Sequence, residues 1–180
     1  MRSPFRRLLT LGRDERAATA VEFAMLVTPL IGLILASLQL TLIFYAGQML
    51  QTAAVTSSRE LMTGNAQQAG KTQIQFKSDV CNAPTVQVLF NCSKVMVDVQ
   101  SASSYTGING AVTTPISVSY DGSGNANPGA YSTGNPGDII ILRVAYDWPV
   151  IASPLMPGLA NEANGEHLLV ATSVFKTEPY

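Results

Sequence analysis

The chain has 180 residues, of which 47% are hydrophobic and only 13% charged, with 11 Lys and Arg against 12 Asp and Glu. This length accommodates one modest domain together with a membrane anchor. The net charge of −1 provides no basic patch of the kind that binds nucleic acid, so we expect no nucleic-acid partner.

A long apolar stretch lies near the N-terminus. From Phe23 to Ala46, about 24 residues carry no formal charge, and as an α-helix they would span roughly 36 Å. This length exceeds the ~30 Å hydrocarbon core of a bilayer, so the stretch predicts a single membrane span at about residues 22–46. Glu22 places a carboxylate at the start of that span.

Charge on the two sides of the span predicts its orientation. The leader, residues 1–17, contains five arginines, whereas residues 47–180 carry six Lys and Arg against nine Asp and Glu. By the positive-inside rule the leader is cytoplasmic and the C-terminal portion is periplasmic or extracellular, as in a single-pass inner-membrane protein. A cleaved secretory signal is disfavoured, because the apolar run is too long and no small-residue cleavage site closes it.

The rest of the chain predicts an α+β fold. Spacings of three and four continue the helix beyond the membrane, so one helix is expected over residues 18–63, with Gly64 as its stop signal. Residues 64–180 then form a β-rich domain with an exposed, mobile loop at 121–137. The outer half of the helix is expected to pack on a small antiparallel sheet, as in a pilin. The expected strands are Val86–Phe90, Lys94–Gln100 (half-buried), Pro115–Tyr120, Asp138–Trp148 (central) and His167–Lys176.

Two cysteines, Cys81 and Cys92, lie in the exported portion. An even count in an oxidising compartment favours one disulfide that closes a short loop. Two free thiols remain the alternative, and metal ligation is disfavoured because His167 is the only further soft ligand. We therefore expect no metal site.

Catalysis is not indicated. The only histidine, His167, opens a predicted strand, and the nucleophile pattern G-x-S-x-G does not occur. Oxygen-bearing side chains alternate at Asp121, Ser123 and Asn125, but without the closing acid of a calcium loop, so an ordinary turn is expected. The chain is predicted not to be an enzyme, and no cofactor or small-molecule substrate is expected.

The N-terminal residues resemble a known family. The string Arg16-Ala17-Ala18-Thr19-Ala20-Val21-Glu22-Phe23-Ala24, followed by Thr28-Pro29-Leu30, is similar to the N-terminus of TadE-like proteins, the pseudopilins of tight-adherence (Tad, type IVc) pili. The cysteine pair, the segment around Val144–Pro149 and the terminal Phe175–Tyr180 also resemble that family. The resemblance implies a minor pilin or pseudopilin for biogenesis of a Tad (Flp-type) pilus, used in adhesion and biofilm formation.

The resemblance also implies how the chain is processed. A prepilin peptidase would cut between Ala17 and Ala18, so that Glu22 becomes the fifth residue of the mature chain. The residue before the cut is more commonly Gly in that family. Partners implied are the membrane, the peptidase, other pilin and pseudopilin subunits, and the pilus assembly platform.

Two interpretations of Glu22 stand side by side. Its carboxylate can pair with the new Ala18 amino group of an adjacent subunit, which would hold subunits in register. Alternatively, Glu22 stays at headgroup level in the first helical turns, where the helix dipole favours an acid. For the whole chain, the alternative function is a single-pass, permanently membrane-anchored periplasmic scaffold or binding protein that is not processed.

Overall fold

The computed structural model describes residues 15–151 and 157–179. The chain divides into two compact units, Met1–Thr41 and Leu42–Tyr180. Most of the leader, predicted at residues 1–17, lies outside the described residues, as does part of the loop that follows Pro149.

Helix α2, Glu15–Met62, contributes to both units. It confirms the long helix predicted over residues 18–63, and Pro29 lies inside it. Gly64 ends the helix with a φ of 76°, and its amide donates to the Leu61 carbonyl oxygen at 3.3 Å. Glycine adopts this left-handed conformation without steric cost, which makes it a common residue after a helix end.

In the first unit the described helix is covered by large exposed apolar side chains, among them Phe23, Leu26 and Leu33. The segment is long and apolar enough to cross a membrane. The predicted span is therefore supported by length and composition, and these side chains have no protein core around them in the described residues.

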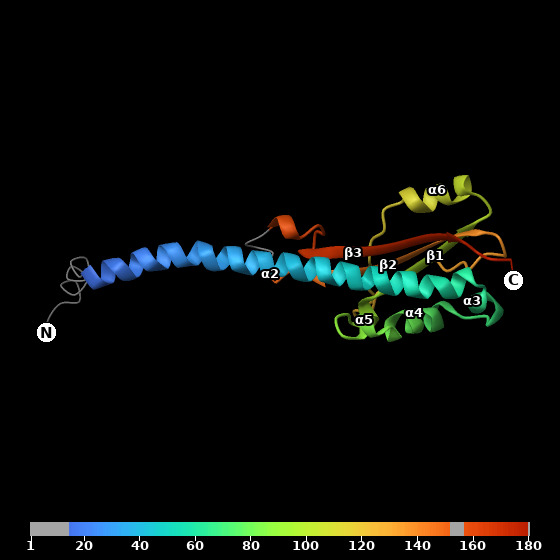
Figure 1. Ribbon diagram of the computed structural model, residues 1–180, viewed down its shortest axis with the longest axis horizontal. Helices are drawn as coiled ribbons and strands as arrows, with labels where there is room; N and C mark the ends of the chain where they lie inside the picture. The colour runs from blue at the N-terminus through green and yellow to red at the C-terminus, as the bar shows by residue number, and fades with distance from the viewer. Residues whose placement is uncertain (1–14, 152–156, 180) are drawn as a thin grey trace. The chain divides into compact units, whose positions relative to one another are not determined.

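The second unit contains a three-stranded antiparallel sheet (Figure 1). Its strands are β1 (Met96–Ala102), β2 (Ile139–Pro149) and β3 (Glu166–Lys176), in the order β1-β2-β3. The α+β fold class is confirmed, and β2 is the central strand as predicted. Short helices complete the unit: α3 (Asn65–Gln68), α4 (Gln73–Asn82), α5 (Pro84–Gln87), α6 (Tyr105–Thr113), η1 (Cys92–Lys94) and η2 (Pro157–Leu159).

The main core lies between one face of the sheet and α2. Every second residue of each strand points to this face, including Val97, Leu142 and Ala171. Opposite them, α2 contributes its small and apolar positions Ile43, Ala46, Leu50, Ala53, Ala54 and Leu61. Alanines at helical spacing let the helix approach the sheet closely, and α4 and α5 add Phe76, Val80 and Val86.

The other face of the sheet is covered as well. Helix α6 packs there through Ile108, and Figure 1 shows α6 and α4 on opposite sides of the strands. The prediction that β1 is half-buried was therefore wrong, because Met96 and Asp98, on the opposite face from Val97, are buried as well. Segments distant in sequence supply a cover that strand periodicity alone does not reveal.

Two predicted strands are absent from the described structure. Val86–Phe90 includes a turn of α5, and its buried residues Val86 and Phe90 are four apart, which is helical spacing. In Pro115–Tyr120, alternate side chains pack against Met96 and Ala145, on the face of the sheet opposite the main core. Only Tyr120 forms a β-bridge, to Ala126. A segment that lies on a sheet shows strand periodicity without joining its ladder.

The loop predicted at 121–137 is partly fixed to the sheet. The Val99 amide donates to Ala130 O, and the Ser132 amide donates to Val99 O, both at 2.8 Å. These bonds cover the outer edge of β1 at one residue. The prediction of a free, mobile insertion therefore holds only in part, because residues 130–132 pair with the edge strand β1 at Val99.

Candidate functional site

The predicted processing site lies near the beginning of α2. Ala17 and Ala18 are in its first turns, and the side chain of Ala18 is exposed. The side chain of Ala17 lies outside the described residues. Helical geometry places Ala18 and Glu22, four residues apart, on the same face of α2.

Glu22 is exposed, and no hydrogen bond or ion pair to another described residue satisfies its carboxylate. Val21 and Phe23 on either side are exposed and apolar. Helix α2 begins at Glu15, about two turns before Glu22, so the partial positive charge of the first-turn amides does little for this carboxylate in the uncut chain. The structure therefore leaves this carboxylate available for a positive group that the single chain does not supply among its described residues.

The cysteines form the predicted disulfide, Cys81–Cys92. Cys81 is in α4 and Cys92 begins η1, so the bond joins α4 to the segment that leads into β1. The alternatives of free thiols and of metal ligation by these cysteines were wrong. The disulfide closes a loop that contains α5, and it fixes that short helix beside the core.

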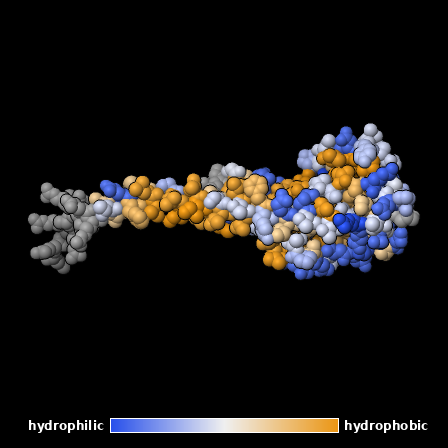
Figure 2. Space-filling view, viewed as in Figure 1, coloured by the Kyte–Doolittle hydropathy of each residue, from blue (hydrophilic) through white to orange (hydrophobic). Residues whose placement is uncertain are grey.

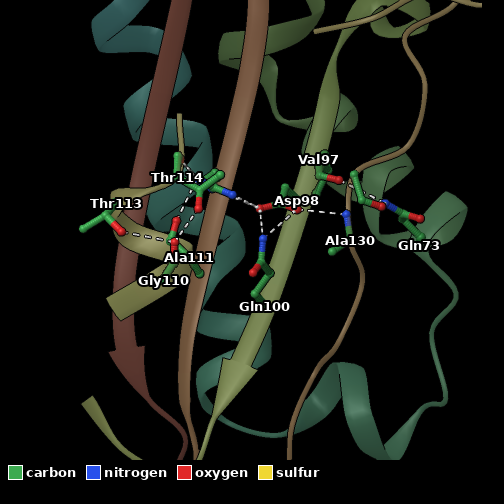
Figure 3. A network of polar contacts seen from close by, with 11 residues as sticks. Gln73, Val97, Asp98, Gln100, Gly110, Ala111, Thr113, Thr114 and Ala130 are labelled. Carbon is green, nitrogen blue, oxygen red and sulfur yellow. Dashed lines mark hydrogen bonds and ion pairs between the residues drawn. The ribbon is translucent and has the colours of Figure 1, made fainter. Parts of the chain in front are cut away.

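A buried ion pair connects β1 and β2 on the face covered by α6 (Figure 3). Arg143 donates to Asp98 Oδ2 from Nε at 3.0 Å and from Nη2 at 2.7 Å. Its Nη1 donates to the carbonyl oxygens of Ala111 and Thr114, each at 2.9 Å. The guanidinium thereby fixes the end of α6 onto the sheet.

The Asp98 carboxylate has two further donors. Oδ1 accepts the Ala130 amide at 2.8 Å, and Gln100 Nε2 donates to Oδ2 at 3.0 Å. These bonds satisfy a charge that would otherwise be costly to bury. Sequence reasoning missed this network, and the available signal was that Asp98 and Arg143 each interrupt an apolar strand.

A second charge cluster joins α2 to α4. Lys71 forms ion pairs with Glu60 and with Asp79, the latter at 2.8 Å. The hydrogen bond to Asp79, followed by the one to Glu60, raises the pKa of Lys71 above its ordinary value of 10.5. The cluster lies at the C-terminal end of α2 and stabilises the connection through α3.

The other side chains considered for chemistry have structural contacts. His167 Nδ1 is 2.7 Å from the Leu159 carbonyl oxygen. Asp121 Oδ1 accepts the amides of Ser123 and Asn125 at 2.9 and 2.8 Å, which is the arrangement of an ordinary turn. Those amide bonds lower the pKa of Asp121, with the Asn125 amide as the largest cause.

Comparison with known proteins supports the N-terminal resemblance. The family described as TadE-like protein matches residues 17–59. The matched segment contains the predicted cut, Glu22 and the described apolar helix. The comparisons with curated proteins and with solved structures returned no match. The predicted resemblance of the C-terminal half therefore stays a prediction.

Proposed function

We propose that the chain is a minor pilin or pseudopilin required for biogenesis of a Tad pilus, because its residues 17–59 match the family described as TadE-like protein. It would act as a structural and assembly protein with no catalytic step of its own. Its pilus would serve adhesion and biofilm formation. The observation that carries the proposal is the exposed Glu22 carboxylate, which has no partner among the described residues and lies at the start of an exposed apolar helical segment. The C-terminal part of the same helix packs into a folded domain.

Processing completes the proposed mechanism. A prepilin peptidase cuts the Ala17–Ala18 bond on the cytoplasmic face and creates a new amino group at Ala18. This amine is positive, and Glu22 of an adjacent subunit is the carboxylate that it meets when the helices pack side by side. In a medium of low dielectric such a pair interacts far more strongly than in water. The pairing therefore sets the register of one subunit against the next.

The exposed apolar side chains support two successive environments. Before assembly, lipid covers Phe23, Leu26 and Leu33, and afterwards neighbouring helices of the pilus or its assembly platform cover them. Both are apolar, so transfer between them costs little hydrophobic free energy. The folded domain, with its own core and disulfide, passes through assembly as a unit on the outer side of the membrane.

Mass spectrometry of the chain purified from cells with and without the peptidase tests the processing step. We expect a mature chain that begins at Ala18 in the first strain and an intact leader in the second. An intact leader in both strains would contradict the processing and favour the permanently anchored scaffold. The comparison also shows whether the peptidase accepts Ala17, which stands where the family more commonly has Gly.

The variant Glu22→Ala tests the pairing. We expect normal membrane insertion and loss of piliation, because the amine of the neighbouring subunit loses its partner. Glu178→Ala, which removes an exposed carboxylate from the folded domain, is the matched control and should assemble normally. Normal pili in the Glu22→Ala strain would refute the pairing mechanism even if processing is intact.

A further inference from the structure

A small apolar surface lies on the folded unit where α5 meets α2. A cavity of about 250 Å³ is lined there by Tyr45, Met49, Pro84, Thr85, Val88 and Leu89, none of them charged. We call these six residues the α5 patch. Val88 is 83% exposed and Tyr45 is half exposed. Figure 2 shows hydrophobic surface over this part of the unit.

The patch is unusual for a surface that contacts only water. Val88 leaves most of its apolar side chain in water, where burial would be favoured by the hydrophobic effect. The disulfide Cys81–Cys92 holds α5 in place, so Val88 is presented by a fixed turn. A contiguous apolar patch on a rigid element indicates an interaction surface.

Its position along α2 indicates what covers it. If the bilayer core begins at Phe23, about 20 residues cross its ~30 Å, so the core ends near Leu42. Tyr45 then lies roughly 5 Å beyond the core, within the headgroup layer, which is roughly 5–8 Å thick on each side. Met49 lies roughly 10 Å beyond the core, just outside that layer. Tyrosine is enriched in the headgroup layer because its ring is apolar and its hydroxyl is polar.

A second exposed apolar residue lies at the same end of the folded unit. Helix α2 runs in the direction of β3, because Gln51 contacts Thr172 at 3.0 Å and Met62 O accepts the Glu178 amide at 2.8 Å. The N-terminal end of this helical segment therefore lies beside the start of β3 and the paired end of β2. Ile151, two residues after β2 ends, is 87% exposed.

The opposite end of the unit provides a contrast. Lys71 binds Glu60, near the C-terminal end of α2, so α4 begins there. Ile74, in the first turn of α4, is 81% exposed. It matches Val88 in chemistry and exposure, but it lies near Glu60, which is about 18 residues, or roughly 27 Å, beyond Leu42 along α2. The α5 patch instead contacts α2 at Tyr45 and Met49.

We propose that the α5 patch rests on the outer surface of the bilayer, with Val88 inserted at the boundary between headgroups and acyl chains. The occupant is lipid, because the patch carries no charge and follows directly from the predicted span. Short apolar insertions of this kind reach ~5–10 Å into the interface. The inference rests on the membrane insertion contained in the proposed function. Insertion orients the folded domain before assembly, and extraction of the helix releases the patch.

Tryptophan fluorescence of the full chain in vesicles tests the proposal. The background variant is Trp148→Phe, which removes the only tryptophan and keeps an aromatic ring against Phe90 and Tyr146. Val88→Trp and Ile74→Trp are then compared in phosphatidylethanolamine and phosphatidylglycerol vesicles with and without brominated acyl chains. Circular dichroism confirms that both variants keep the fold.

We expect brominated lipid to remove the larger part of the emission of the Val88→Trp protein and to leave that of Ile74→Trp unchanged. A blue shift of the first emission on vesicle binding should accompany the quenching. Equal quenching at both positions, or none at Val88→Trp, would overturn the proposal.

Flotation of the same samples separates this inference from its premise. A protein that floats with vesicles but shows no quenching at Val88→Trp refutes the α5 patch as a lipid contact and leaves the span intact. A protein that does not float refutes the membrane insertion and therefore both proposals. Flotation with selective quenching supports both.

Discussion

The two halves of α2 differ in how their apolar side chains are distributed and in what surrounds them. Leu33, in the first unit, is 70% exposed, whereas Leu50, in the second, is fully buried against the sheet. The first half uses large side chains all round, while the buried stripe of the second half alternates leucine with alanine. A helix that is apolar on every face suits lipid, and a helix with one narrow apolar stripe suits a sheet.

This comparison separates two kinds of stability. Apolar residues of the second half contribute to the unfolding free energy of the folded unit, because water reaches them only when the unit unfolds. Those of the first half contribute to transfer into a membrane or a helical assembly. Matched substitutions in the two regions should therefore have different effects on unfolding, and the predictions below test this.

The largest expected difference concerns charge. Arg143→Met leaves the buried Asp98 carboxylate without its cation, and loss of one partner of such a pair destabilises by about 3–5 kcal/mol. Glu22→Gln removes an exposed carboxylate of the first unit and should change the unfolding free energy by less than about 0.5 kcal/mol. Denaturant unfolding of both variants in detergent measures the difference. Similar values would contradict the assignment of Arg143 to a core network.

A leucine pair tests the helix itself. Leu50→Ala opens a cavity between α2 and the sheet and should cost about 2–5 kcal/mol in unfolding free energy. Leu33→Ala removes the same atoms from an exposed position and should leave unfolding of the folded unit unchanged. Its effect should appear instead as weaker retention in membranes. The comparison fails if Leu33→Ala destabilises the folded unit as much as Leu50→Ala does.

Loss of the disulfide should have a somewhat smaller effect. In the chain-entropy model, opening the loop between Cys81 and Cys92 costs about 3 kcal/mol. Cys81→Ser with Cys92→Ser should lower the unfolding midpoint and loosen α5, with no effect on the first half of α2. Hydrogen exchange of α5 amides measures the local change. Unchanged exchange there would show that packing alone fixes α5.

The smallest effect is a pH dependence from Lys71. Its folded pKa is raised, so its ion pairs contribute stability that is fully present below the ordinary value of 10.5 and is lost as the pH rises through the folded pKa. Wild type should therefore lose stability on alkaline titration, and Lys71→Met should lose less over the same range. Added salt should reduce the difference, because the cluster is partly exposed. A steeper loss in the variant would contradict this role.

The sequence predicted most of what is local and periodic. The long helix, its Gly64 stop, the central strand at β2 and the disulfide follow from apolar spacing, one glycine and an even cysteine count. It failed at Val86–Phe90 and Pro115–Tyr120, where apolar residues two apart were interpreted as strands. In a short segment the same residues fit a helical turn or a covering loop, and only neighbours decide which.

For the candidate site the division is similar. The apolar run and the Glu22 carboxylate can be identified from consecutive residues of the sequence. Helical periodicity alone places Ala18 and Glu22 on one face. The pairing of Asp98 with Arg143 joins positions 45 residues apart, and it exists only because β1 and β2 are adjacent and α6 excludes water. The exposure of Val88 likewise depends on how the disulfide and the core position α5. Periodicity within one element is thus determined by the sequence, whereas contacts between elements were decided by the tertiary structure, because burial depends on which distant segments cover a face.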